Sequence, residues 1–321
     1  MKIKNFIKFV FITAAFTACK KSEQPPVVPP VINPTVDIYA TGITDNVAAY
    51  WKNGNVVKLT DSINCEANAI VINGNDIYVA GRLNAQACYW KNGNITHLRG
   101  ETPSFTQAIS VSGNDVYVVG AMATRTPYPG AVYWKNGVPI RLVTDSSAFS
   151  WAYGIAISGN DVYITGYTTS TSGFVIPTYW KNGIATYLDA DGQTTSNASS
   201  IFLNGTDVYV AGGIGSRAAY WKNDVLSIIS QQNNSYINAM VVNNNGVYLA
   251  GNAGLDTAAY WKNGVISKLP ANSIGLSMAV NGSDVYVAGY SIFDGAIYWK
   301  NGVQVQLSPN GELHGIALVP K

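Results

Sequence analysis

The chain is poor in charge. Only 12% of its 321 residues are Asp, Glu, Lys or Arg, and the 20 basic residues nearly balance the 18 acidic ones. Proteins that bind nucleic acid gather a basic patch or stripe, because their affinity comes largely from cations that neutralise phosphates. The sequence shows no such footprint, so a nucleic-acid partner is not expected.

Groups that carry catalysis are also few. The only histidines are His97 and His314, so most acid–base schemes lack a member. The sequence has no G-x-S-x-G elbow, no phosphate-cradling glycine loop and no Cys/His cluster with metal-ligand spacing. Neither a metal site nor a cofactor is expected, and enzymatic activity is the less favoured class.

A helical period is missing too, and a repeat takes its place. The pentapeptide Tyr-Trp-Lys-Asn-Gly first occurs at residues 50–54 and returns six times, with Asp224 in place of Gly in the fifth copy. Its tryptophans are Trp51, Trp90, Trp134, Trp180, Trp221, Trp261 and Trp299, at intervals of 38 to 46 residues. Only Trp151 stands outside this set.

A second motif alternates with the first. The segment NGNDIYVAG begins at Asn73, and related copies begin at Ser112, Ser158, Asn204, Asn243 and Asn281. Each unit reads as four short strands A to D, for example residues 69–73, 76–80, 87–91 and 95–98. Gly-Asn and Asn-Gly between them are typical of tight primed turns. Four-stranded units with a period of about 40 residues predict an all-β fold, a β-propeller.

The repeat region begins and ends out of phase by one strand. It opens on a strand B at Val36 and ends on an orphan strand A at residues 314–320. The last strand must pair with the first three strands to complete a blade, which removes the open sheet edges that invite aggregation. We predict a seven-bladed propeller of four-stranded blades over residues 36–321. A solenoid with free caps is the alternative.

The repeat resembles the HAF-type extracellular repeat of bacteria and, more loosely, the NHL-type propeller unit. The resemblance rests on A-x-Y-W-x-N-G-x-x-x-x-L followed by G-I-A-I-S-G-N-D-V-Y-I-T-G-Y, and it covers nearly the whole body. It implies the propeller fold. It transfers no catalytic residue, because such repeats are structural units shared by proteins of diverse activity.

Residues 1–18 read as a signal peptide, with Lys2, Lys4 and Lys8 before the apolar run 9–18. The run ends in Phe-Thr-Ala-Cys, which resembles the lipobox of bacterial lipoproteins, and the following Lys-Lys-Ser resembles lipoproteins of the Bacteroidota. This resemblance implies cleavage before Cys19, lipidation of Cys19, and a membrane partner reached through the lipid. An ordinary secretory signal with an incidental cysteine is the alternative.

Residues 19–35 continue as a Pro-rich tether, an extended spacer between the lipidated Cys19 and the folded body. The expected location is the outer membrane, on its periplasmic or its cell-surface face. Loss of the three signal-peptide lysines leaves 17 basic and 18 acidic residues, a net charge of about −1.

The Tyr–Trp pairs are predicted to be core. Neighbouring strand residues face opposite sides, so Tyr50 and Trp51 should point into two different blade interfaces. The residue three before each Trp is Ala in six copies and Pro177 in one, which suits wedge-shaped packing. The Asp after each A–B turn, such as Asp76, is expected to bond local backbone N–H groups and not a metal.

Cys65 and Cys88 are predicted to be free thiols. Cys88 takes an apolar position in strand C, and Cys65 lies just before strand A of the same unit. Strand B separates the two, so they should be roughly 9–10 Å apart, beyond the span of a disulfide.

Two varied columns at the start of strand A are predicted to ring the mouth of the central channel, on the face of the variable B–C and D–A links. The first column is Glu66, Phe105, Trp151, Asn197, Tyr236, Ile274 and Glu312, and the second is Asn68, Gln107, Tyr153, Ser199, Asn238, Leu276 and His314. Variable loops on a rigid scaffold are a favourable place for binding. The predicted ligand-binding residues are Trp151, Phe105, Tyr236, Asn197, Glu66, Glu312, Tyr153, Gln107 and Asn238.

These features favour a lipid-anchored binding or scaffolding module of the bacterial envelope, a monomer whose partner is a glycan, a peptide or a protein. One alternative is a carbohydrate-active enzyme, a glycoside hydrolase or lyase, with Glu66 and Glu312 as a carboxylate pair and His314 nearby. The other is a purely structural envelope protein with a water-filled polar funnel.

Overall fold

The computed structural model describes residues 36–123, 129–142, 149–170, 173–188, 196–230 and 232–321, all within the compact unit Thr35–Lys321. The signal peptide, Cys19 and the tether lie outside the described residues, so their assignments stay predictions. Every regular element in the described part is a β-strand, and none of it forms a helix able to cross a membrane.

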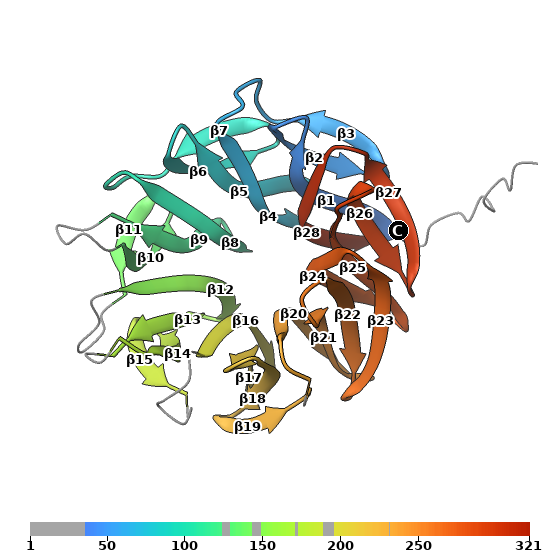
Figure 1. Ribbon diagram of the computed structural model, residues 1–321. Helices are drawn as coiled ribbons and strands as arrows, with labels where there is room; N and C mark the ends of the chain where they lie inside the picture. Colours follow the sequence, from blue (N-terminus) through green and yellow to red (C-terminus); the bar gives the residue numbers. More distant parts are fainter. Residues whose placement is uncertain (1–35, 124–128, 143–148, 171–172, 189–195, 231) are drawn as a thin grey trace, which may run out of the picture. The chain divides into compact units, whose positions relative to one another are not determined.

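The strands of the described residues form seven four-stranded antiparallel blades around a central channel (Figure 1). From the centre outward, blade 1 is β28 (Gly311–Pro320), β1 (Val36–Thr44), β2 (Val47–Lys52) and β3 (Asn55–Lys58). Blade 2 is β4 (Cys65–Asn73), β5 (Asp76–Leu83), β6 (Gln86–Lys91) and β7 (Asn94–His97). Blade 3 is β8 (Ser104–Ser112), β9 (Asp115–Met122), β10 (Gly130–Lys135) and β11 (Val138–Arg141).

The remaining blades repeat this order. Blade 4 is β12 (Ser150–Ser158), β13 (Asp161–Thr169), β14 (Val175–Lys181) and β15 (Ile184–Tyr187). Blade 5 is β16 (Ser196–Asn204), β17 (Asp207–Ile214), β18 (Arg217–Lys222) and β19 (Val225–Ile228). Blade 6 is β20 (Ser235–Asn243), β21 (Gly246–Ala253), β22 (Thr257–Lys262) and β23 (Val265–Ala271). Blade 7 is β24 (Ser273–Asn281), β25 (Asp284–Ser291), β26 (Gly295–Lys300) and β27 (Val303–Ser308).

The predicted seven blades and their closure are confirmed. The C-terminal strand β28 pairs antiparallel with β1 from Val36↔Pro320 to Thr44↔Gly311. Hydroxyl groups of Thr44 and Ser308 also meet at 2.8 Å across blades 1 and 7. The ring therefore closes within the described body and leaves no inner strand without its neighbour.

The turn chemistry explains why the copies look alike on one face. The Asn of every pentapeptide has a positive φ of 47–53°, and the following Gly has a φ of 80–85° in the six copies that have one. Two consecutive positive φ values define the type I′ turn, which Asn and Gly tolerate best. The C–D hairpins are therefore set locally by Asn-Gly, as the sequence predicts.

The aromatic pair of each pentapeptide packs between blades, as predicted. All seven repeat tryptophans are at most 1% exposed. Trp51 belongs to a core cluster with Tyr286 of blade 7, whereas Tyr50 packs against the cluster of Trp90 in blade 2. Each pentapeptide thus contributes one ring to the interface before its blade and one to the interface after it.

Cys65 and Cys88 are both buried and both free, which confirms the prediction. Cys65 also joins two blades, because its Sγ accepts a hydrogen bond from the amide of Ala48 at 3.0 Å. Ser104 makes the equivalent bond in the next blade, with its Oγ 2.9 Å from the amide nitrogen of Ala87. The Cys65 thiol therefore links blades 1 and 2 in the same way as the Ser104 hydroxyl links blades 2 and 3.

The Asp after the A–B turn makes different bonds from those predicted. Asp76 Oδ1 accepts from Asn92 Nδ2 at 2.7 Å, and its Oδ2 lies 2.8 Å from Lys91 Nζ. The backbone amide of Ile77 is bonded instead by Asn92 Oδ1, at 2.8 Å. The prediction of a local backbone bond was wrong, because the Asn of the C–D turn reaches across the strand pair and takes that amide.

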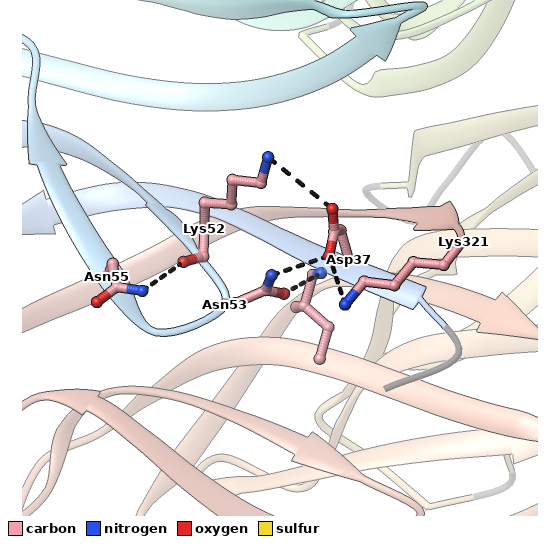
Figure 2. A network of polar contacts seen from close by, with 6 residues as sticks. Asp37, Lys52, Asn53, Asn55 and Lys321 are labelled. Atoms are coloured by element: carbon pink, nitrogen blue, oxygen red, sulfur yellow. Dashed lines mark hydrogen bonds and ion pairs between the residues drawn. The ribbon is translucent and has the colours of Figure 1, made fainter. Parts of the chain in front are cut away.

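Figure 2 shows this polar network in blade 1, where the end of the chain joins it. Asp37 accepts from Asn53 at 2.9 Å, and the ammonium of Lys321 lies 3.1 Å from the same carboxylate oxygen. These bonds, led by that from Asn53, lower the pKa of Asp37. The network ties the last residue of the chain to the first strand of the ring.

Every inner strand carries a β-bulge close to the channel mouth. The pairing skips one residue between Ala67 and Ala69 in β4, and the same shift recurs in all seven blades. The skipped residues are Asn68, Gln107, Tyr153, Ser199, Asn238, Leu276 and His314. A bulge leaves its extra residue out of the ladder and re-aims the side chain.

The glycine of each YVAG-type segment makes this bulge possible. A Cβ at Gly212 would overlap the carbonyl oxygen of Asn197, which lies just before the bulge of β16. The same clash, with the carbonyl of the first-column residue, occurs at Gly42, Gly81, Gly120, Gly166, Gly251 and Gly289. Glycine is required here for close backbone approach and not for a turn.

We predict that Gly212→Ala lowers the free energy of unfolding by about 2–3 kcal/mol, because the new methyl group must displace backbone. Gly213→Ala is the matched control in the same strand. Its Cβ would meet only Arg217 O at 3.3 Å and Asn197 Oδ1 at 3.4 Å. We expect a cost below about 1 kcal/mol there. Urea unfolding of both variants checks this, and equal midpoints would contradict it.

Candidate functional site

The bulges build the candidate site by turning one side chain per blade into the channel. They surround a cavity of about 420 Å³ at its mouth. The cavity is lined by Glu66, Asn68, Gln107, Tyr153, Asn197, Ser199, Asn238, Leu276 and His314. All seven members of the predicted second column are in this wall.

The structure divides the predicted binding residues into two groups. Glu66, Gln107, Tyr153, Asn197 and Asn238 line the cavity. Phe105, Trp151, Tyr236 and Glu312 do not line it. The first column therefore contributes little to the wall, because the bulge presents the second column instead.

Four of the bulged side chains hold the ring together. Asn68 Nδ2 donates to the carbonyl of Thr106 at 2.9 Å, and Asn238 Nδ2 donates to that of Gly275 at 2.7 Å. The Ser199 hydroxyl donates to the carbonyl of Ile237, and His314 Nδ1 lies 3.1 Å from the carbonyl of Ala67. Each of these bonds runs from one blade to the next, and we call the set the inter-blade belt.

The belt is interrupted at blades 3, 4 and 7. Leu276 of blade 7 has no polar group in its side chain. Gln107 of blade 3 lines the cavity without a hydrogen-bond partner among the described residues, and so does Asn197 of blade 5. Between them, the ring of Tyr153 of blade 4 packs against the ring of Tyr167 of its own blade. Blades 3 to 5 therefore offer the uncommitted polar groups of the wall.

An aromatic chain lies beside this sector. Ring centroids are 5.8 Å apart for Tyr153–Tyr167, 5.6 Å for Tyr167–Phe149, 6.2 Å for Phe149–Trp151 and 5.2 Å for Trp151–Phe105. Such tilted contacts each contribute about 0.5–1.5 kcal/mol beyond burial. Burial raises the pKa of both Tyr153 and Tyr167, so both hydroxyls stay protonated at neutral pH.

A salt bridge continues the aromatic chain at its other end. The guanidinium of Arg82 lies 4.7 Å from the centroid of Phe105, within the range of a cation–π contact, and it pairs with the carboxylate of Glu66. Asn68 Nδ2 donates to the other carboxylate oxygen at 3.3 Å. The wall therefore holds a neutralised pair at this point and not an isolated charge.

The second acid of the channel is also paired. Glu312 Oε2 lies 3.2 Å from His314 Nε2, and this contact lowers the pKa of Glu312 although partial burial opposes it. Hydrolysis of a glycoside by two carboxyl groups needs one whose pKa is raised, so that it can donate a proton. Glu312, whose pKa is lowered, does not fit that role, and the carboxylate of Glu66 is engaged in the salt bridge with Arg82.

Sequence reasoning missed Arg82, Tyr167 and Phe149. Arg82 and Tyr167 each follow the glycine of a YVAG-type segment, where the strand register places them opposite Glu66 and Trp151. The same alignment of copies contained this column, so the signal was available for these two. Phe149 lies in a D–A link outside the repeat pattern, where no alignment could have found it. Within the described residues, no group of three or more His, Cys, Asp or Glu could hold a metal ion.

Comparisons with known proteins support the fold. No protein-family model matches the chain, and no curated protein sequence matches it. Two solved structures, provisionally assigned as 6-phosphogluconolactonases of Bacteroides fragilis and Bacteroides uniformis, are each 10% identical to it, with TM-scores of 0.51 and 0.52. The matches cover 91% and 88% of this chain and 100% and 99% of theirs.

A third structure shows how little the likeness says about activity. A puromycin-hydrolyzing peptidase of Mycobacterium tuberculosis is 9% identical, with a TM-score of 0.52 over 85% of this chain and 53% of its own. Proteins with different assignments thus share the architecture. At these identities the likeness shows the propeller fold alone, and function has to be argued from the site.

Proposed function

We propose that the protein is a lipid-anchored binding module of the bacterial envelope, whose ligand docks at the channel mouth on the face of the variable loops. The observation that carries this proposal is the cavity of about 420 Å³, in which Gln107 and Asn197 have no partner among the described residues. Both side-chain amides face the cavity and are not among the buried unpaired atoms, so they can bond a ligand without giving up a bond within the described part of the protein. A ligand with hydrogen-bonding groups would pair them.

The architecture supports a binding role. The wall is fixed by the bulges and the inter-blade belt, so the side chains are ordered before a ligand arrives, which lowers the entropy cost of binding. β1 begins and β28 ends on the face of the short A–B and C–D turns, as the pairing of Val36 with Pro320 shows. The variable-loop face is therefore not crowded by either end of the described body.

Ligand binding is tested with the soluble body of residues 35–321, which contains every described strand and the closing pair. A glycan array and a peptide array would be probed with this body, and hits would be measured by calorimetry. We expect at least one hit with a dissociation constant in the micromolar to millimolar range. Substitutions of the cavity wall should weaken its binding. If nothing on either array binds, the binding role is wrong.

The anchor needs its own experiment. The full chain would be expressed in a diderm host with a clickable palmitate analogue, beside the Cys19→Ser variant. Label on the parent chain and none on the variant supports lipidation. A parent chain without label, released as soluble protein, would refute it.

A further inference from the structure

We infer that the ligand is an uncharged oligosaccharide and that it binds in one sector of the channel mouth, against Gln107, Tyr153 and Asn197 of blades 3, 4 and 5. This inference rests on the proposed binding function and specifies where the ligand lies and what it is. The three residues come from β8, β12 and β16, which are neighbours around the channel (Figure 1).

The sector is identified by which polar groups are already used. Four of the bulged side chains donate a hydrogen bond to a backbone carbonyl of the next blade, namely Asn68, Ser199, Asn238 and His314. Gln107 and Asn197 do not, since no hydrogen bond joins either side-chain amide to another described residue. Asn68 and Asn238 keep an unpaired amide oxygen, but in Gln107 and Asn197 of the described wall both the donor and the acceptor of the amide are uncommitted, and these two residues lie in blades 3 and 5.

The chemistry of these groups fits a sugar. Each free amide offers a donor and an acceptor a short distance apart, and neighbouring hydroxyl groups of a pyranose offer the same pair in return. Among the described residues that line the cavity, Tyr153 is the one with an aromatic ring. Its apolar face suits the C–H face of a sugar ring, and the contact between the rings of Tyr153 and Tyr167 helps to fix its orientation.

The charges of the wall disfavour an ionic ligand. Its acid Glu66 is paired with Arg82, and its histidine His314 contacts Glu312. An acidic saccharide would find no uncommitted cation among the described residues of the wall, and a basic ligand would compete with a salt bridge. A neutral saccharide carries only uncharged hydroxyl groups, so its binding would need no free cation and would not compete with a salt bridge.

The backbone disfavours an extended peptide. Peptides that add to a sheet need an unbroken strand edge, whose amides and carbonyls they pair in sequence. The inner strands do face the channel, but each has its bulge at the mouth, between Ala152 and Gly154 in β12 for example. The edge is interrupted where a peptide would enter, so recognition has to come from side chains.

The decisive experiment compares a substitution in the sector with the reverse substitution outside the cavity. Gln107→Leu keeps the size of the side chain and removes its polar atoms, whereas Leu226→Gln makes the reverse change on the outer strand β19, where the side chain is 39% exposed and does not line the cavity. Neutral hexasaccharides (cellohexaose, xylohexaose, mannohexaose and maltohexaose) would be titrated into the body by calorimetry, beside hexagalacturonate and a hexapeptide library. Asn197→Ala serves as a second sector variant, and thermal midpoints confirm that each variant folds.

We expect at least one neutral hexasaccharide to bind, with affinity reduced about 10-fold by Gln107→Leu or Asn197→Ala, the effect of about one lost hydrogen-bond pair. Leu226→Gln, which lies outside the cavity, should bind as the parent does. Binding confined to hexagalacturonate or peptide would refute the sugar class and leave the binding function standing. Neutral sugar bound equally by parent and sector variants would refute the sector. Absence of binding to every probe would refute this inference together with the proposed function.

Discussion

A chain that ends at Asn310 should lose the cooperative unfolding transition of the closed ring. The truncation removes β28, and with it nine backbone pairs to β1 and the buried side chains of Leu313 and Ile316. Burial of one such side chain contributes about 1.5–3 kcal/mol, and the exposed inner edge of β1 would offer a template for aggregation. Circular dichroism during urea titration and light scattering would measure both effects.

The matched control removes only Lys321. Its ammonium pairs with Asp37, but the Lys321 side chain is 48% exposed, and such surface pairs contribute at most about 1 kcal/mol. This variant should therefore unfold with nearly the parent midpoint. A synthetic peptide of residues 311–321, added to the truncated chain, should restore part of the transition. A truncated chain as stable as the parent would mean that the closing strand is not required.

The fold was predictable because its determinants are local and repeated. Asn-Gly fixes each C–D hairpin, and Tyr-Trp at a period of about 40 residues fixes which strand faces which interface. The closure followed from counting, since a strand A left over at residues 314–320 had one place to pair. Each of these inferences depends only on residues of one repeat unit or of two units that are neighbours in the ring.

The candidate site was predictable only in part, because the bulges decide it. The sequence alignment found the second column but favoured the first, which contains Trp151 and supplied six of the nine predicted ligand-binding residues. The bulge between Ala152 and Gly154 presents Tyr153 to the cavity, whereas Trp151 packs between Phe105 and Phe149. The glycine opposite each bulge, Gly166 in this blade, was visible in the sequence. Only the strand register shows that a carbonyl oxygen lies so close to it that a Cβ would not fit.

The inter-blade belt was invisible to sequence for a different reason. Asn68 and Gln107 occupy equivalent positions and are both amides, yet only Asn68 reaches the next blade. Whether an amide is used by the ring or left for a ligand depends on distances between blades. Residue type alone therefore predicted a polar mouth, and the structure was needed to separate the side chains that bond the next blade from those that do not.

The packing role of the repeat tryptophans leads to the second large effect. Trp90→Ala should lower the free energy of unfolding by about 3–5 kcal/mol, the usual cost of removing a large aromatic side chain from a core. Trp90 is 1% exposed and belongs to the cluster of Val79, Cys88 and Ala48 at the interface of blades 1 and 2. Urea unfolding at neutral pH would measure the loss as a lower midpoint.

Trp151→Ala is the control that the chain itself provides. Trp151 is half-buried on the variable-loop face, where its ring contacts Phe105 and Phe149, and its indole N–H has no hydrogen-bond partner among the described residues. Loss of two aromatic contacts should cost about 1–3 kcal/mol, less than the loss at Trp90. If the Trp151 variant were the less stable of the two, Trp151 would be a core residue like the seven repeat tryptophans. The aromatic chain that contains Trp151 would then stabilise the packing of the blades and would not support the proposed ligand-binding side chains.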